Sequence, residues 1–240
     1  MRKFLIPAAV ALAVAAVEVA PTIAQDAAPT TMTVDAKVTP SKGGTKSKPV
    51  GHKLVVKMAW TTTGDVEHPI ITDGDVFFPK GSVYNGGKYP KCALATLSHG
   101  GPAACPPHSI MGSGTGDAWA DTVKTIPKIT VINGGSNVTY FWTVLQNPAR
   151  VQAAVVGKIT KPGGKWAYKL HFEVPKSLQI VAGIPITLNT LTVTAGGKSY
   201  AKDWLATNSC PSSKKWPFEA HANLSTGGSV SFDDSVACTK

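Results

Sequence analysis

The chain has 240 residues, of which 43% are hydrophobic, and a formal net charge of +10 at pH 7. This length permits one large all-β domain or two small domains. The excess positive charge comes mostly from lysines that are scattered along the chain, so the dense basic runs typical of nucleic-acid-binding segments are absent. We therefore expect no sequence-specific nucleic-acid partner. The charge is expected mainly to keep the protein soluble, with anionic envelope polymers as candidate partners.

Residues 1–24 have the pattern of an export signal. Arg2 and Lys3 give a positive start, residues 4–17 are apolar, and small residues lead up to Ala24. The apolar run is shorter than the about 20 residues that a membrane-spanning helix needs. We predict cleavage after Ala24, no transmembrane segment in the mature chain, and a secreted or cell-envelope location.

Residues 25–31 are predicted to be a disordered start, and residues 32–240 a single domain. Apolar and polar residues alternate along most of this domain, as they do in half-buried strands. The clearest alternating segments are residues 34–38, 54–60, 138–144, 151–159, 166–174 and 216–224. Glycine pairs between segments are typical of hairpin turns. The pattern predicts an all-β fold, an antiparallel two-sheet β-sandwich of roughly ten strands, Ig-like or jelly-roll-like.

Four cysteines, an even number in a chain predicted to be exported, favour two disulfides. A zinc site is disfavoured because no pair has the C-x-x-C spacing. Three pairings are possible, and local pairing closes the shortest loops. We therefore expect one bond between Cys92 and Cys105 and a second between Cys210 and Cys238.

The segment from residue 92 to residue 116 combines two cysteines, two histidines and alternating glycines. The three glycines that share one face of an expected strand are Gly112, Gly114 and Gly116. Such a bare face lets another backbone or a large aromatic lie close, and Trp142 and Trp166 are candidates. A phosphate-binding loop would need a helix after it, but the following DAWADTV is strand-like. We interpret the segment as scaffolding held by a disulfide.

The arrangement FPKG…NGGKYPKC…L…GGPAACPPHSIMGSGTGDA resembles a pattern in secreted proteins of unknown function from high-GC Gram-positive bacteria. In that pattern an FP-G turn leads to P-x-C, then to C-P-x-x-S and an alternating glycine strand. A second cysteine pair brackets a C-terminal hairpin, as Cys210, Trp216 and Cys238 do here. The resemblance spans most of the mature chain. It implies a secreted, disulfide-bonded β protein, and it brings no activity or functional residues.

No specific catalytic motif is present. The G-x-S-x-G elbow of many serine hydrolases is absent. Two carboxylate pairs, Asp73 with Asp75 and Asp233 with Asp234, lie beside turn residues and are interpreted as backbone caps. We expect a non-catalytic binding or structural module at the cell envelope or outside the cell, without a cofactor. A secreted hydrolase with a spatially assembled site is the alternative.

Two strands each carry a histidine and a glutamate on the outward face: His171 with Glu173, and Glu219 with His221. If these strands were neighbours, the four side chains could converge on a divalent ion. Outward strand positions are ordinarily polar, however, so we predict no metal and keep the four residues as a speculative set.

The six tryptophans raise the possibility of glycan binding. Four of them lie on the apolar phase of their strands, which indicates core packing: Trp60, Trp142, Trp166 and Trp216. Trp119 and Trp204 are the remaining candidates for exposure. Trp119 shares a face with Asp117 and Asp121, and these three residues are the predicted binding surface, with glycans as candidate partners.

Overall fold

The computed structural model of the chain describes residues 30–63 and 69–240. The predicted export signal lies outside the described residues, as do residues 25–29. The first strand already includes Thr30 and Thr31, which the sequence pattern assigned to a disordered start.

Strands make up most of the described chain. In order they are β1 (Thr30–Thr39), β2 (Val50–Gly51), β3 (Lys53–Thr62), β4 (Ile71–Pro79), β5 (Ser82–Tyr84), β6 (Ile110–Ala120), β7 (Val123–Thr125), β8 (Lys128–Asn133), β9 (Val138–Leu145), β10 (Val151–Thr160), β11 (Trp166–Glu173), β12 (Ile180–Val181), β13 (Ile184–Gly196), β14 (Leu205–Thr207), β15 (Lys215–Leu224) and β16 (Ser229–Ala237). The short helices are η1 (Gly86–Lys88), α1 (Leu94–Gly100), η2 (Pro102–Ala104) and α2 (Lys176–Gln179).

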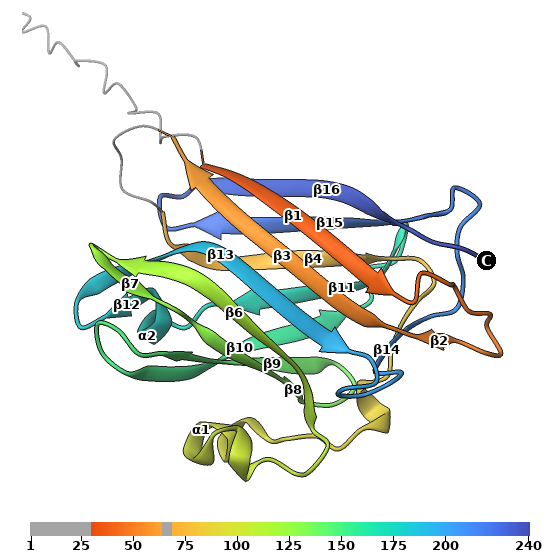
Figure 1. The fold of residues 1–240 in the computed structure, drawn as a ribbon, viewed down its shortest axis with the longest axis horizontal. Coiled ribbons are helices and arrows are strands. Elements are labelled where there is room, and N and C mark those ends of the chain that lie inside the picture. Colours follow the sequence, from red (N-terminus) through yellow and green to blue (C-terminus); the bar gives the residue numbers. More distant parts are fainter. Residues whose placement is uncertain (1–29, 64–68) are drawn as a thin grey trace, which may run out of the picture.

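One antiparallel sheet of 13 strands contains most of these elements. Its path runs β1-β3-β13-β6-β8-β9-β10-β11-β4-β15-β16, with β12 paired to β13 and β7 paired to β6. A second sheet of three strands, β2-β14-β5, lies near one end of the large sheet (Figure 1). The prediction of an antiparallel all-β fold is confirmed.

The large sheet curls until its edge strands, β1 and β16, lie beside each other, as Figure 1 shows. Because each step along the path is antiparallel, the odd number of strands leaves β1 and β16 parallel. A parallel bridge between Lys42 and Thr239 joins the chain just beyond them. The fold is therefore nearly barrel-shaped, and the predicted two-sheet sandwich is wrong. Strand alternation could not distinguish the two, since both arrangements bury one face of every strand.

The glycines of β6 allow the neighbouring strand β13 to come close. A Cβ atom on Gly112 would collide with the Thr194 carbonyl, and one on Gly116 with the Thr190 carbonyl. Backbone therefore fills the space beside these glycines. The predicted aromatic alternative is wrong for Trp142, which lies against Gly101 in another part of the fold.

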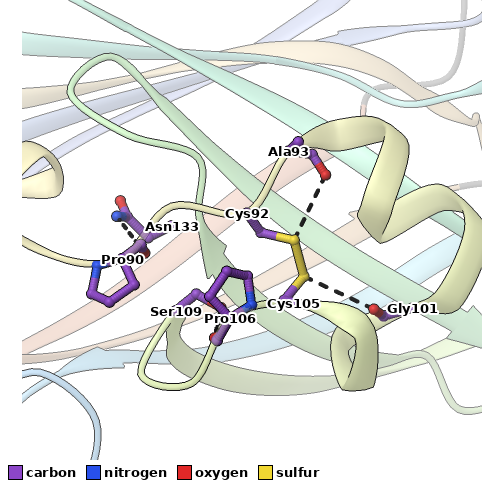
Figure 2. The surroundings of a disulfide bond; sticks show 8 residues. All are labelled: Pro90, Cys92, Ala93, Gly101, Cys105, Pro106, Ser109 and Asn133. Atoms are coloured by element: carbon purple, nitrogen blue, oxygen red, sulfur yellow. Dashed lines mark hydrogen bonds between the residues drawn. A yellow bond between two sulfur atoms is a disulfide. The ribbon is translucent and has the colours of Figure 1, made fainter.

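The Cys92–Cys105 disulfide closes an excursion on the outer face of the sheet. Figure 2 shows the bond joining the chain just before α1 to the chain just after η2. Within this excursion Leu97 is fully buried and packs in a cluster with Tyr140 and Trp142 of β9. The excursion thus covers an aromatic surface of the sheet, and the scaffold interpretation agrees with this packing.

Local pairing of the cysteines is confirmed. The second disulfide joins Cys210 to Cys238, and no cysteine is free among the described residues. Cys210 and Cys238 are buried with Trp216 in a cluster beside the end of β1.

Candidate ligand-binding cavity

The interior of the curled sheet is incompletely filled. Side chains along β3, β10 and β11 are mostly only half-buried, including those of the inward apolar phase. The buried residues divide into five separate clusters. A packed domain of this size ordinarily has one contiguous core with inward side chains fully buried. The sheet therefore encloses space.

That space is a cavity of about 370 Å³. Its volume lies within the range of roughly 300–1,000 Å³ that is usual for small-molecule sites. The wall consists mainly of aliphatic and aromatic side chains from strands on all sides of the sheet. Representative members are Val56, Met58, Val76, Phe141, Leu170 and Phe172. Such a surface accommodates apolar atoms and offers water few partners.

Tyr84 and Trp204 line the cavity near the three-stranded sheet, but their polar atoms bond to the wall. The Tyr84 hydroxyl donates to the Gly135 carbonyl at 3.0 Å, and Trp204 Nε1 donates to Asn133 Oδ1 at 3.3 Å. Burial raises the pKa of Tyr84 well above its usual range. The polar atoms of Tyr84 and Trp204 are thus bonded within the wall, and the lining they leave is mainly apolar.

His52 is the buried imidazole of this wall. Its Nδ1 lies 2.8 Å from the Pro40 carbonyl oxygen and its Nε2 lies 2.8 Å from Thr207 Oγ1. A carbonyl only accepts, so Nδ1 carries a proton, and in the neutral ring the Thr207 hydroxyl donates to Nε2. Trp216 packs edge-on against the ring, with centroids 5.3 Å apart. This geometry fits a neutral imidazole, which is the form that burial favours.

This neutral His52 should make stability depend on pH. Burial lowers the pKa of folded His52 below the ordinary value of 6.5. The unfolded chain then binds a proton more readily, so the free energy of unfolding should fall as pH drops through 6.5 toward the folded pKa. His52→Gln should flatten that fall, measured by urea unfolding at about pH 7.5 and about pH 5.5. His99→Gln, at an exposed site on α1, is the control. Equal pH dependence in wild type and His52→Gln would contradict this assignment.

The predicted surface residues lie outside the cavity. Trp119 is on the outer face of β6 and is 36% exposed. Asp117 forms an ion pair with Lys124 at 2.9 Å, and Asp121 follows the strand in a turn with a φ of 52°. Asp117 and Trp119 share the outer face, whereas Asp121 leaves the strand. Binding at this surface stays a prediction.

The speculative metal set is divided by a third strand. His171 and His221 each lie opposite Asp75, which belongs to β4 between β11 and β15. His171 Nδ1 is 2.9 Å from Asp75 Oδ1, and His221 Nε2 is 2.6 Å from Glu219 Oε1. This last hydrogen bond lowers the pKa of Glu219. His171 Nε2 also lies 3.4 Å from Glu173. Within residues 30–63 and 69–240, no three such side chains are arranged to hold a metal ion.

The row of outward side chains that includes His171, Asp75 and His221 is also relevant to the predicted hydrolase alternative. His221 of β15 lies between two neighbours: Ser231 of β16 is opposite it on one side, and Asp75 of β4 is opposite it on the other. The strand register therefore gives the order Ser-His-Asp. His221 Nε2 bonds to Glu219, however, and in the described part of the chain no hydrogen bond joins it to Ser231. The row is on the outer face of the sheet and lacks a bonded nucleophile–base pair.

Two tryptophans, Trp204 and Trp166, differ from their predicted positions. Trp204 is buried, at 3% exposure. Trp166 lies next to Phe77, with ring centroids 5.6 Å apart, because a register shift before Tyr168 turns Trp166 to the outer face. Trp142 is buried in a core cluster as predicted, on the outer face of β9 under the α1 excursion. Trp60 and Trp216 line the interior as predicted.

The four aspartates interpreted as turn caps are strand residues. Asp73 and Asp75 belong to β4, and Asp233 and Asp234 belong to β16. The capping interpretation is wrong because these strands continue through positions that the sequence pattern assigned to turns.

Comparison with known proteins does not identify the chain: no protein-family model and no curated protein matches it. In the described ranges, none of the helices has the length and apolar character required to span a membrane.

Proposed function

We propose that this protein is an exported, non-catalytic binding protein that holds a small apolar molecule inside its curled sheet. The observation that carries the proposal is the cavity of about 370 Å³ with its apolar wall. Transfer of apolar surface from water into such a space is favourable by about 25 cal/mol per Å². A ligand that filled it would gain binding energy mainly from burial.

The size of the cavity argues against incidental poor packing. Core cavities made by mutation cost about 24 cal/mol per Å³, so an empty space of this volume would cost on the order of 9 kcal/mol. Whole domains are stable by only about 5–15 kcal/mol. A cost of that order supports a space that is used by a ligand.

Two further features support a role outside the cytoplasm. The chain begins with the pattern of an export signal, and its four cysteines form two disulfides. Disulfides persist mainly in oxidising compartments. The ligand would then be an apolar molecule met at the cell envelope or outside the cell.

A titration of the mature, oxidised protein with the apolar fluorophore N-phenyl-1-naphthylamine tests the proposal. We expect saturable binding at one site per chain that survives moderate salt, because apolar contacts are not screened as surface charge is. Trp119→Ala should bind the probe like wild type, since Trp119 lies on the outer face. Absence of saturable binding would overturn the proposed function. Loss of binding in Trp119→Ala would place the site on the surface.

A further inference from the structure

Among the described residues, the hydrogen-bonded path around the curled sheet is interrupted between its edge strands. β1 pairs only with β3, and β16 pairs only with β15, within the described residues. The two edges face each other without a ladder of backbone hydrogen bonds along their length. Beyond them, Thr239 bonds to Ser41 and Gly43 through its backbone and ties the strands together at one end. We call the line between β1 and β16 the seam.

Side chains close the seam at both ends but not at its middle. Met32 and Val34 pack with Val230 toward one end. Val38 packs with the Cys210–Cys238 cluster toward the other. Between them, Ala36 lines the cavity and belongs to neither cluster. A methyl group is the only side chain that β1 supplies at this level.

Asp234 occupies the corresponding level of β16. The parallel bridge between Lys42 and Thr239 lies just beyond the two strands. Counting six residues back on each side from this bridge places Ala36 near Asp233 and Asp234. Asp234 is opposite Phe218, which lines the cavity, so its side chain is on the inward phase.

An inward position in a closed sheet would be buried, yet Asp234 is exposed. No described residue forms a hydrogen bond or ion pair with its carboxylate. Phe232 and Val236, on the same face at either side, are apolar and half-buried. A carboxylate that is free, exposed and set in an apolar inner face marks the place where the interior meets solvent.

We propose that the cavity opens at the middle of the seam, and that its ligand is an amphiphile with an amine at its polar end. The apolar body lies in the cavity, and the ammonium group stays at the mouth, where it donates hydrogen bonds to Asp234. A charged group remains at the mouth because moving it into the apolar interior would be costly. An ionised carboxylate only accepts hydrogen bonds, so it favours an ammonium and repels an anionic end group. This inference rests on the proposed function.

The test compares dodecylamine and dodecanoate, which have equal chain length and opposite charge, as displacers of N-phenyl-1-naphthylamine. Wild type should bind the amine more tightly. Asp234→Asn should weaken amine binding roughly three- to fivefold, as for an exposed ion pair, and the difference should shrink at high salt. Asp233→Asn is the matched control, because Asp233 is on the outer phase of the same strand.

Access through the seam has its own readout. Ala36→Trp should slow probe association about tenfold in a stopped-flow experiment, because the indole fills the mouth. Lys37→Trp, on the outward phase of β1, should leave the rate unchanged. An unchanged rate in Ala36→Trp, or equal amine affinity in wild type and Asp234→Asn, would overturn the inference while probe binding still upheld the proposed function. Failure of wild type to bind the probe would overturn both.

Discussion

Leu170→Trp should reduce affinity for an apolar probe at least tenfold and leave the free energy of unfolding unchanged or higher. Leu170 lies on β11 in the cavity wall and is only half-buried. An indole there would take up space that a ligand needs. In a filled core the same enlargement would cost about 1–3 kcal/mol through overpacking. Probe titration and denaturant unfolding of the one variant measure both effects.

Ile132→Trp is the matched control for this prediction. Ile132 is fully buried beneath the α1 excursion, outside the cavity wall. It should show the overpacking cost and keep probe binding in the fraction that folds. If Leu170→Trp were destabilised to the same degree as Ile132→Trp, the space beside Leu170 would be filled in solution.

Removal of the Cys210–Cys238 disulfide should lower the free energy of unfolding by about 3–4 kcal/mol. The bond closes a loop with a sequence separation of 28 residues, and loop-closure entropy gives about 3.6 kcal/mol for that length. Both cysteines are buried with Trp216 beside the end of the seam that Thr239 ties together. We choose alanine because a serine at a buried position would add a polar group without a partner. Denaturant unfolding of the Cys210→Ala, Cys238→Ala double variant measures the loss.

The Cys92–Cys105 pair provides the comparison. Its separation of 13 residues gives about 2.9 kcal/mol by the same relation. This bond holds an excursion on the outer face, whereas the other lies at the seam. Its double alanine variant should therefore keep probe binding. A seam disulfide whose removal changed the stability by less than about 0.5 kcal/mol would show that the seam end is held by other contacts.

Much of the strand content could be predicted from local pattern. Alternation located the strands around Val56, Tyr168 and Ala220. Local disulfide pairing followed from loop length. The helix α1 was not predicted, because its two turns carry only a short apolar pattern and it is held by the Cys92–Cys105 bond.

The closure of the sheet could not be predicted in the same way. It depends on which strands become neighbours, as when β13 inserts between β3 and β6, far from both in sequence. The alternation pattern also gave the wrong face where a register shift is present. Trp166 has the spacing of an inward-facing residue, but its side chain lies on the outer face. Strand alternation looks identical around a filled and a hollow interior, so the cavity had no sequence signal.

Asp234 shows what the structure adds. In the sequence it was one of a pair of acidic residues attributed to a turn, whereas in the structure it is the inward-phase carboxylate at the middle of the seam. The proposed role of Asp234 depends on its position beside β1, a strand that is almost the full length of the chain away in sequence. Residues that mark the mouth of such a cavity come together only when the sheet curls.

A crystal structure of the mature protein bound to a long-chain alkylamine with a terminal bromine would test the central claim most directly. We predict one anomalous bromine peak inside the curled sheet, between the walls formed by β3 and β11, with the amine near Asp234. Bromine peaks confined to the outer surface, or an interior closed around protein side chains alone, would contradict it.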